Sequence, residues 1–136
     1  MIELTNTVAQ TVQPGQAVTF NKVLLHTGRG SECFTERANN SVKLRNNGIY
    51  EVQFSGNIGG TAAGTPVQLA IALGDQALAE TVMVSTPAAA SDFNNVATGT
   101  YVRNCCCDFD RITVVNTGTV PTLLSANMNL RIKRLA

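Results

Sequence analysis

The fold is decided by a short stretch, NGIYEVQFSGNI, at residues 47–58. Apolar side chains or glycine occupy every second position from Tyr50 to Ile58, and polar side chains occupy the positions between them. This period of two predicts a β-strand with one face in the core, and the preceding Asn-Gly pair is typical of a tight turn. We therefore expect this segment to lie in a packed sheet.

The opposite face of this strand carries Glu51, Gln53, Ser55 and Asn57. This face is too polar for a core, yet it has less charge than an ordinary solvated surface. A nearly neutral face that forms hydrogen bonds is suited to packing against another copy of the same chain. Residues 123–134 repeat the alternation, with Ser and Asn between apolar residues. The two segments together predict a self-associating β-protein rather than an enzyme.

Length and charge narrow the class of protein. The 136 residues predict a single domain, 1–136. Charged residues are 14% of the chain, against roughly 25% in typical soluble domains. No Lys or Arg occurs between Arg45 and Arg103, so we expect no nucleic-acid partner. The sequence has neither a secretory signal pattern nor a long apolar run, which predicts synthesis in the cytoplasm and no membrane insertion.

Turn residues recur at short intervals, and the segments between them are rich in Val, Ile, Thr, Phe and Tyr. This pattern is typical of an all-β sandwich or barrel. The Ala and Leu content of residues 67–84 also suits a helix, but Gly74 and the flanking Pro66 and Pro87 favour a hairpin. The expected strands lie near 4–12, 18–25, 33–37, 41–45, 48–58, 66–73, 77–84, 95–104, 109–116 and 123–134.

The order of these segments resembles the C1q/TNF-like jelly-roll superfamily. The resemblance is carried by Gly-x-Tyr-x-Val-x-Phe at 48–54, Val-x-Leu-x-Ile running into Gly-Asp at 67–75, Asp-x-Ile-x-Val before Asn-Thr-Gly at 110–118, and Asn-x-Asn-Leu at 127–130. It is closer to the bacterial and bacteriophage members, such as the heads of collagen-like spore-surface proteins and phage fibre or decoration proteins, than to the animal members.

This resemblance implies a ten-stranded jelly-roll sandwich that assembles as a compact homotrimer. The sheet with the first, fifth, eighth and tenth strands would face the three-fold axis. The side chains expected at the trimer interface are Gln53, Ser55, Asn57, Tyr101, Ser125, Asn127 and Asn129.

The function implied is non-enzymatic. The chain would be a structural or interaction module on the surface of a bacteriophage particle, made in the host cytoplasm and acting as a fibre head, capsid decoration or host-adhesion component. Its partners would be other copies of itself, other virion proteins and a cell-surface glycan. A bacterial spore- or cell-surface protein of the same fold, and a carbohydrate-binding module, are the alternatives.

Candidate catalytic and metal-binding residues are few, and we expect no cofactor. His26 is the single histidine, and no Gly-x-Ser-x-Gly motif accompanies it. Asp108 and Asp110 lie on one side of an extended strand, where they suit a calcium ion or an ion pair with Arg103 or Arg111. Cys33 and the run Cys105-Cys106-Cys107 fit packed reduced thiols, a contact or disulfide across a symmetry axis, or a metal site.

Overall fold

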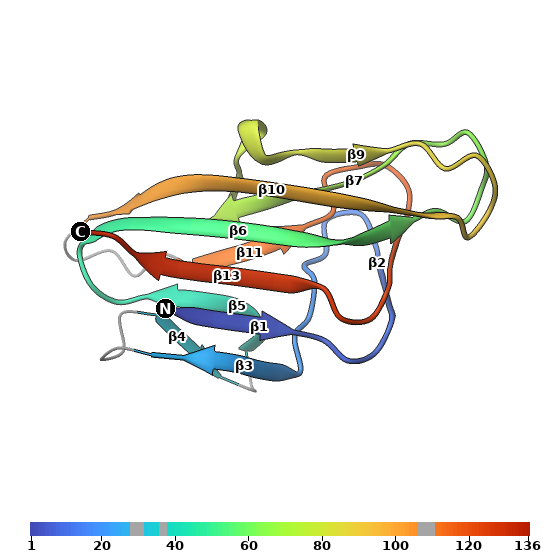
Figure 1. Ribbon diagram of the computed structural model, residues 1–136. Helices are drawn as coiled ribbons and strands as arrows, with labels where there is room; N and C mark the ends of the chain where they lie inside the picture. The colour runs from blue at the N-terminus through green and yellow to red at the C-terminus, as the bar shows by residue number, and fades with distance from the viewer. Residues whose placement is uncertain (28–31, 36–37, 106–110) are drawn as a thin grey trace.

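The computed structural model describes residues 1–27, 32–35, 38–105 and 111–136, which form two antiparallel β-sheets packed against each other (Figure 1). One sheet has seven strands in the described part: β2 (Gln10–Val12), β12 (Thr122–Leu124), β6 (Gly48–Gly59), β13 (Asn129–Arg134), β1 (Ile2–Thr5), β3 (Lys22–His26) and β10 (Phe93–Asn104). The other has six: β4 (Glu32–Thr35), β5 (Ala38–Leu44), β11 (Arg111–Val115), β7 (Val67–Leu73), β8 (Gln76–Ala77) and β9 (Met83–Ser85).

The strand predicted at residues 48–58 lies in the interior of the seven-stranded sheet as β6. β10 pairs with one of its edges from Gly48 to Gly59, while β13 and β12 share the other edge. The first, fifth, eighth and tenth expected strands all belong to this sheet, as predicted. β10 and β3 are therefore edge strands on its two sides (Figure 1), and β2, which among the described strands pairs only with β12, is an edge strand as well.

The core lies between the two sheets and contains the apolar face of β6. Tyr50, Val52, Phe54 and Ile58 are fully buried, which confirms the predicted alternation. The Tyr50 hydroxyl donates to the Asn46 carbonyl oxygen at 2.8 Å, so the phenol is buried without losing its hydrogen bond. Burial of each large apolar side chain stabilises the fold by about 1.5–3 kcal/mol.

Two of the expected strands are each divided into two, and the two breaks are neighbours in the sheet. Residues 4–12 form β1 and β2, and residues 123–134 form β12 and β13. The Asn6 amide donates to the Thr19 carbonyl oxygen at 3.0 Å, and the Asn127 backbone N–H donates to the Asn6 carbonyl oxygen at 2.8 Å. Asn127 has φ +68°, which ends regular pairing. The two breaks therefore lie next to each other in the sheet.

The other differences also follow from local hydrogen bonding. The expected strand 77–84 is divided into β8, a 3-10 turn at Ala79–Thr81 and β9. The buried Thr81 hydroxyl accepts from the Ile71 N–H at 2.9 Å and donates to the Leu78 carbonyl oxygen at 2.7 Å. In a continuous strand, backbone groups of the neighbouring strand would take the place of this hydroxyl. These three divisions turn the ten expected strands into the thirteen of the described residues.

The expected strand 18–25 is shortened to β3. The residues before it cross from one sheet to the other. Ala17 forms an isolated bridge with Val115, and the Val18 N–H donates to the Val114 carbonyl oxygen at 2.7 Å. Val18 and Phe20 are buried in the core although neither lies in a strand.

Asn116 joins the two sheets where β11 ends, and its side chain is buried. Its amide nitrogen donates to the carbonyl oxygens of Val12 (2.8 Å) and Val120 (2.9 Å), and its oxygen accepts from the Gly118 N–H (2.8 Å). An Asn116→Ala substitution should lower the free energy of unfolding by about 3 kcal/mol, because it leaves buried backbone groups without partners. Urea denaturation measures this. The control, Asn40→Ala at an exposed asparagine, should change stability by less than about 0.5 kcal/mol; equal effects of the two substitutions would contradict the role of Asn116.

Candidate functional site

The outer face of the seven-stranded sheet, here called the polar face, brings together most of the residues predicted for self-association. Its neutral half is built from strand-paired rows. Asn57 lies opposite Asn95, whose amide donates to the Asn57 side-chain oxygen at 3.1 Å. In the next row Ser55 lies between Ala97 and Asn129. This half of the face has amides and hydroxyls in place of charges.

The other half of the polar face carries charges of both signs. Arg131 lies opposite Gln53 and Glu3, and its Nε is 3.1 Å from Glu3 Oε1. In the following row Glu51 lies between Tyr101 and Lys133. Both chain termini lie at this end of the sandwich (Figure 1). The face is therefore polarised along its strands, neutral at one end and mixed in charge at the other.

A shallow hollow of about 350 Å³ follows β10 on the polar face. It forms because Ala97 and Gly99 are small where neighbouring positions carry long side chains. A Cβ at Gly99 would lie 3.3 Å from the Cγ of Gln53, so the Gln53 side chain lies against this glycine. Tyr101 stands beside the hollow with 66% of its surface exposed. The predicted interface residue Tyr101 is thus free to contact another molecule.

Two predicted interface residues lie outside regular strands. Ser125 and Asn127 occupy the connection between β12 and β13, not a continuous strand as expected. The Ser125 N–H donates to the Asn57 carbonyl oxygen at 3.0 Å, so this connection borders the neutral half of the polar face. Gln53, Ser55, Asn57 and Asn129 lie on the face as predicted, and this placement by itself leaves their role in a trimer a prediction.

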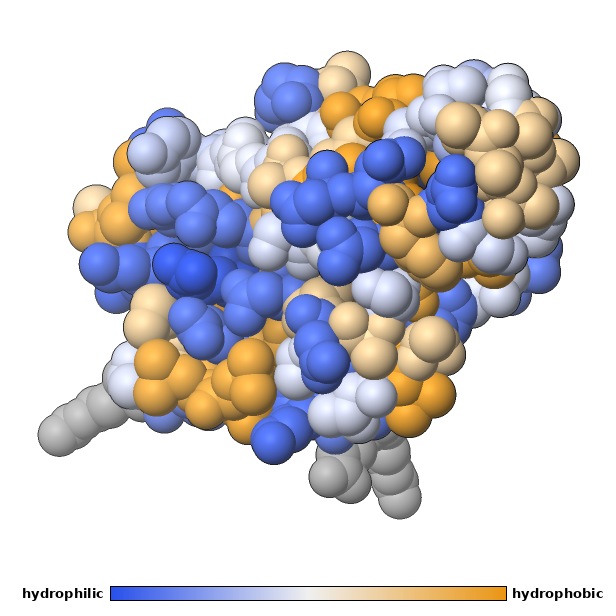
Figure 2. Space-filling view, turned by 45° about the vertical axis from the view of Figure 1, so that its right-hand side comes forward, coloured by the Kyte–Doolittle hydropathy of each residue, from blue (hydrophilic) through white to orange (hydrophobic). Residues whose placement is uncertain are grey.

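Sequence reasoning missed two apolar edges that border the polar face. All five residues of β3 are exposed, among them Val23, Leu24 and Leu25; this cluster is called the β3 edge. At the opposite side Val82 and Val84 are exposed; they form the β9 edge, next to β10. Figure 2 shows hydrophobic surface near the lower edge, where β3 runs, and at the upper edge, where β9 runs, with hydrophilic surface between them.

Most of the remaining candidate residues lie outside the part of the chain that the structure describes. Asp108, Asp110, Cys106 and Cys107 fall outside the described residues, and so does the side chain of Cys33. Cys105 is an exposed free thiol, and His26 is exposed at the end of β3. Among the described residues, no three His, Cys, Asp or Glu side chains are grouped to hold a metal ion.

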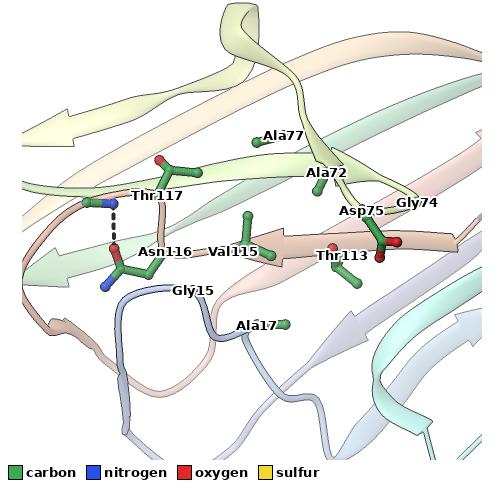
Figure 3. Close-up of a pocket in the computed structure, with 11 residues that line it drawn as sticks. Gly15, Ala17, Ala72, Gly74, Asp75, Ala77, Thr113, Val115, Asn116 and Thr117 are labelled. Atoms are coloured by element: carbon green, nitrogen blue, oxygen red, sulfur yellow. Dashed lines mark hydrogen bonds between the residues drawn. The ribbon is translucent and has the colours of Figure 1, made fainter.

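A second hollow, here called the outer hollow, lies on the other side of the sandwich (Figure 3). It has a volume of about 620 Å³ and opens on the outer face of the six-stranded sheet. Small side chains of β7, β8 and β11 form its floor, and the segment 15–17 and the turn at Gly74-Asp75 border it. Residues far apart in the sequence meet here, and no sequence motif had indicated the site.

In the described part of the chain no helix is both long and apolar enough to span a bilayer.

Comparisons with known proteins identify the fold. No protein-family model matches the sequence, and no curated protein sequence matches it. Among solved structures, the globular domain of zebrafish complement 1qA protein matches with a TM-score of 0.72 and 13% identity, covering 99% of this chain and 96% of that chain. Murine APRIL matches with a TM-score of 0.65 and 15% identity, covering 98% and 97% respectively. Eiger TNF from S. frugiperda matches with a TM-score of 0.64 and 12% identity, covering 99% and 91%. The chain is thus an all-β sandwich with the C1q/TNF-like jelly-roll fold.

Proposed function

We propose that this chain is a non-enzymatic structural and interaction module that forms a homotrimer through its polar face. The observation that carries the proposal is the arrangement of that face, which is neutral over half its length and bordered by two different apolar edges. A solvated sheet face ordinarily presents many charges, and exposed apolar clusters with a polar rim are typical of protein–protein contacts.

The difference between the two edges favours a cyclic assembly. In a two-fold dimer the same patch meets itself, whereas in a ring one patch of each copy meets a different patch of the next copy. The β3 edge includes Lys22, and the β9 edge lies beside Glu80. Opposite charges therefore accompany the two apolar clusters. The β3 edge of one copy suits the β9 edge and the adjoining hollow along β10 of the next.

The polar face is also suited to lie near a symmetry axis. Like charges brought together at an axis repel one another by about 1 to 4 kcal/mol per pair at 4 Å, depending on the local dielectric. Asn57, Ser55 and Asn129 avoid this cost, because amides and hydroxyls both donate and accept hydrogen bonds. At the other end Glu3 and Arg131 neutralise each other within one copy.

The number of subunits and the biological setting rest on the resemblance of the sequence to C1q/TNF-like proteins. On that basis the trimer belongs on the surface of a bacteriophage particle, as a fibre head, capsid decoration or adhesion component that contacts other virion proteins. A spore- or cell-surface protein of the same fold is the alternative. Immunolabelling of purified particles with an antibody against the chain distinguishes the two settings.

Light scattering on a sizing column tests the assembly. The wild-type protein should have about three times the 14.4 kDa mass of one chain. Leu24→Lys should reduce the mass to that of one chain, because it places an unpaired charge within the apolar contact. Leu135→Lys is a matched control, since Leu24 and Leu135 are exposed to 48% and 46%. A wild-type monomer, or an unchanged mass for Leu24→Lys, would refute the proposed contact.

A second substitution tests the location of the axis. Asn57→Arg should weaken the trimer at least tenfold, because three guanidinium groups would meet on the neutral half of the polar face. Thr113→Arg places the same side chain on the outer face of the six-stranded sheet, where it should leave the trimer intact. Sedimentation across a dilution series gives both dissociation constants. Equal constants would show that Asn57 lies away from the axis.

A further inference from the structure

The outer hollow is a preformed depression held by backbone hydrogen bonds. The Gly15 N–H donates to the Asn116 carbonyl oxygen, and the Asn116 N–H donates to the Gln16 carbonyl oxygen, both at 2.9 Å. At the other end the Gly74 N–H donates to the Arg111 carbonyl oxygen at 2.8 Å. These bonds fix the two borders of the hollow relative to its floor, so a ligand would not have to order them.

The floor of the hollow is formed by small, mostly apolar side chains. Strand pairing places Ala77, Ala72 and Thr113 side by side across β8, β7 and β11, and Ala17 next to Val115. Small side chains thus occupy an outward-facing surface where long polar side chains would be usual; Ala77 is exposed, Ala17 and Val115 are half-buried, and Ala72 between them is only 3% exposed. The core does not require small residues here, because these side chains point away from it (Figure 3).

Three polar side chains at the hollow retain hydrogen-bonding capacity. The Asp75 carboxylate and the Thr113 hydroxyl have no partner among the described residues, and both lie at the end of the hollow near Gly74 (Figure 3). The Thr117 hydroxyl accepts from the Gln68 amide at 2.9 Å, so its own proton is available to a ligand. Asn116 differs, because both side-chain atoms are used within the protein.

We infer that the outer hollow binds a neutral hexopyranose, either free or as part of a glycan. A pyranose ring has a C–H face that suits the methyl floor and a rim of hydroxyls. The Asp75 carboxylate can accept from two adjacent hydroxyls, and the two threonines can exchange hydrogen bonds with others. Asp75 is the only charged residue that lines the described part of the hollow, so acidic sugars and phosphate esters are disfavoured.

The described residues that line the outer hollow include no aromatic ring, which limits the expected affinity. Without a stacking surface, a single sugar should bind with a dissociation constant of about 1 mM or weaker. The site lies on the opposite side of the sandwich from the polar face. Binding should therefore be independent of self-association.

An NMR titration of the full-length protein with methyl hexopyranosides of mannose, glucose and galactose tests the inference. At least one should shift the backbone amides of Ala72, Asp75, Ala77, Thr113 and Thr117 in a saturable manner, while glucuronate should not. No saturable shift with any of the three sugars, or shifts confined to other residues, would overturn the assignment. An equal response to glucuronate would also overturn it. Glucosamine provides a further comparison: much tighter binding by this amine would replace the neutral sugar with a cationic ligand.

Matched variants connect the shifts to the proposed groups. Asp75→Asn and Thr113→Val should each weaken binding at least fivefold, whereas Asp92→Asn and Thr11→Val, at exposed positions away from the hollow, should leave it unchanged. Equal affinities in all four variants would contradict the assignment. Leu24→Lys should bind the sugar as the wild type does, so failure of the trimer and failure of the sugar site are distinguishable. A trisaccharide that binds tenfold tighter than its monosaccharide would identify a glycan chain as the source, and equal affinities would identify a free sugar.

Discussion

The pairing of β6 along both of its edges is the constraint on which the rest of the structure depends. β10 follows one edge over the full length of β6, and β13 and β12 occupy the other. A strand paired on both sides cannot slip by one residue without turning its buried row toward solvent. The alternation that begins at Tyr50 therefore fixes the orientation of the neighbouring strands. Both the composition of the core and the rows of the polar face follow from this single register.

In residues 48–58 and 123–134 the alternation of the sequence predicted which side chains face the core, but not where the strands end. The alternation through residues 123–134 is nearly continuous, and Asn127 fits it as an ordinary polar position. Asn6 lies in phase with the apolar residues Leu4 and Val8 and so interrupts their row, but no Gly or Pro flanks either asparagine to mark a break. They break the strands through hydrogen bonds to residues that are distant in sequence, such as the bond from the Asn127 N–H to the Asn6 carbonyl oxygen. Thr81 interrupts a strand because its hydroxyl, and not a backbone group, bonds to the Ile71 N–H and the Leu78 carbonyl oxygen. Such partners are determined by the folded arrangement, so periodicity alone cannot reveal them.

The candidate sites differ in how far they could be predicted. The polar face could be predicted because Gln53, Ser55 and Asn57 alternate with buried residues within one strand. The β3 edge could not be predicted, because Val-Leu-Leu in a short strand is also the composition of a buried strand. Its exposure follows from its position at the margin of the sheet. The outer hollow combines three segments, near residues 15–17, 72–77 and 113–118. Small side chains in any one of these segments do not indicate a hollow, because it forms only where the three segments meet.

The two proposed sites lie on opposite faces of the sandwich, and this separation has a consequence for binding. A ring closed through the polar faces leaves the six-stranded sheets outward, so each trimer would present three copies of the outer hollow to its surroundings. A site with millimolar affinity for one sugar is of little use to a monomer. When several such sites engage linked sugars on one surface, the second and third contacts become intramolecular, and avidity exceeds single-site affinity by about 10²–10⁴. Self-association through one face would thus turn a shallow, non-aromatic hollow on the other face into an effective adhesive surface, without any change in the hollow itself.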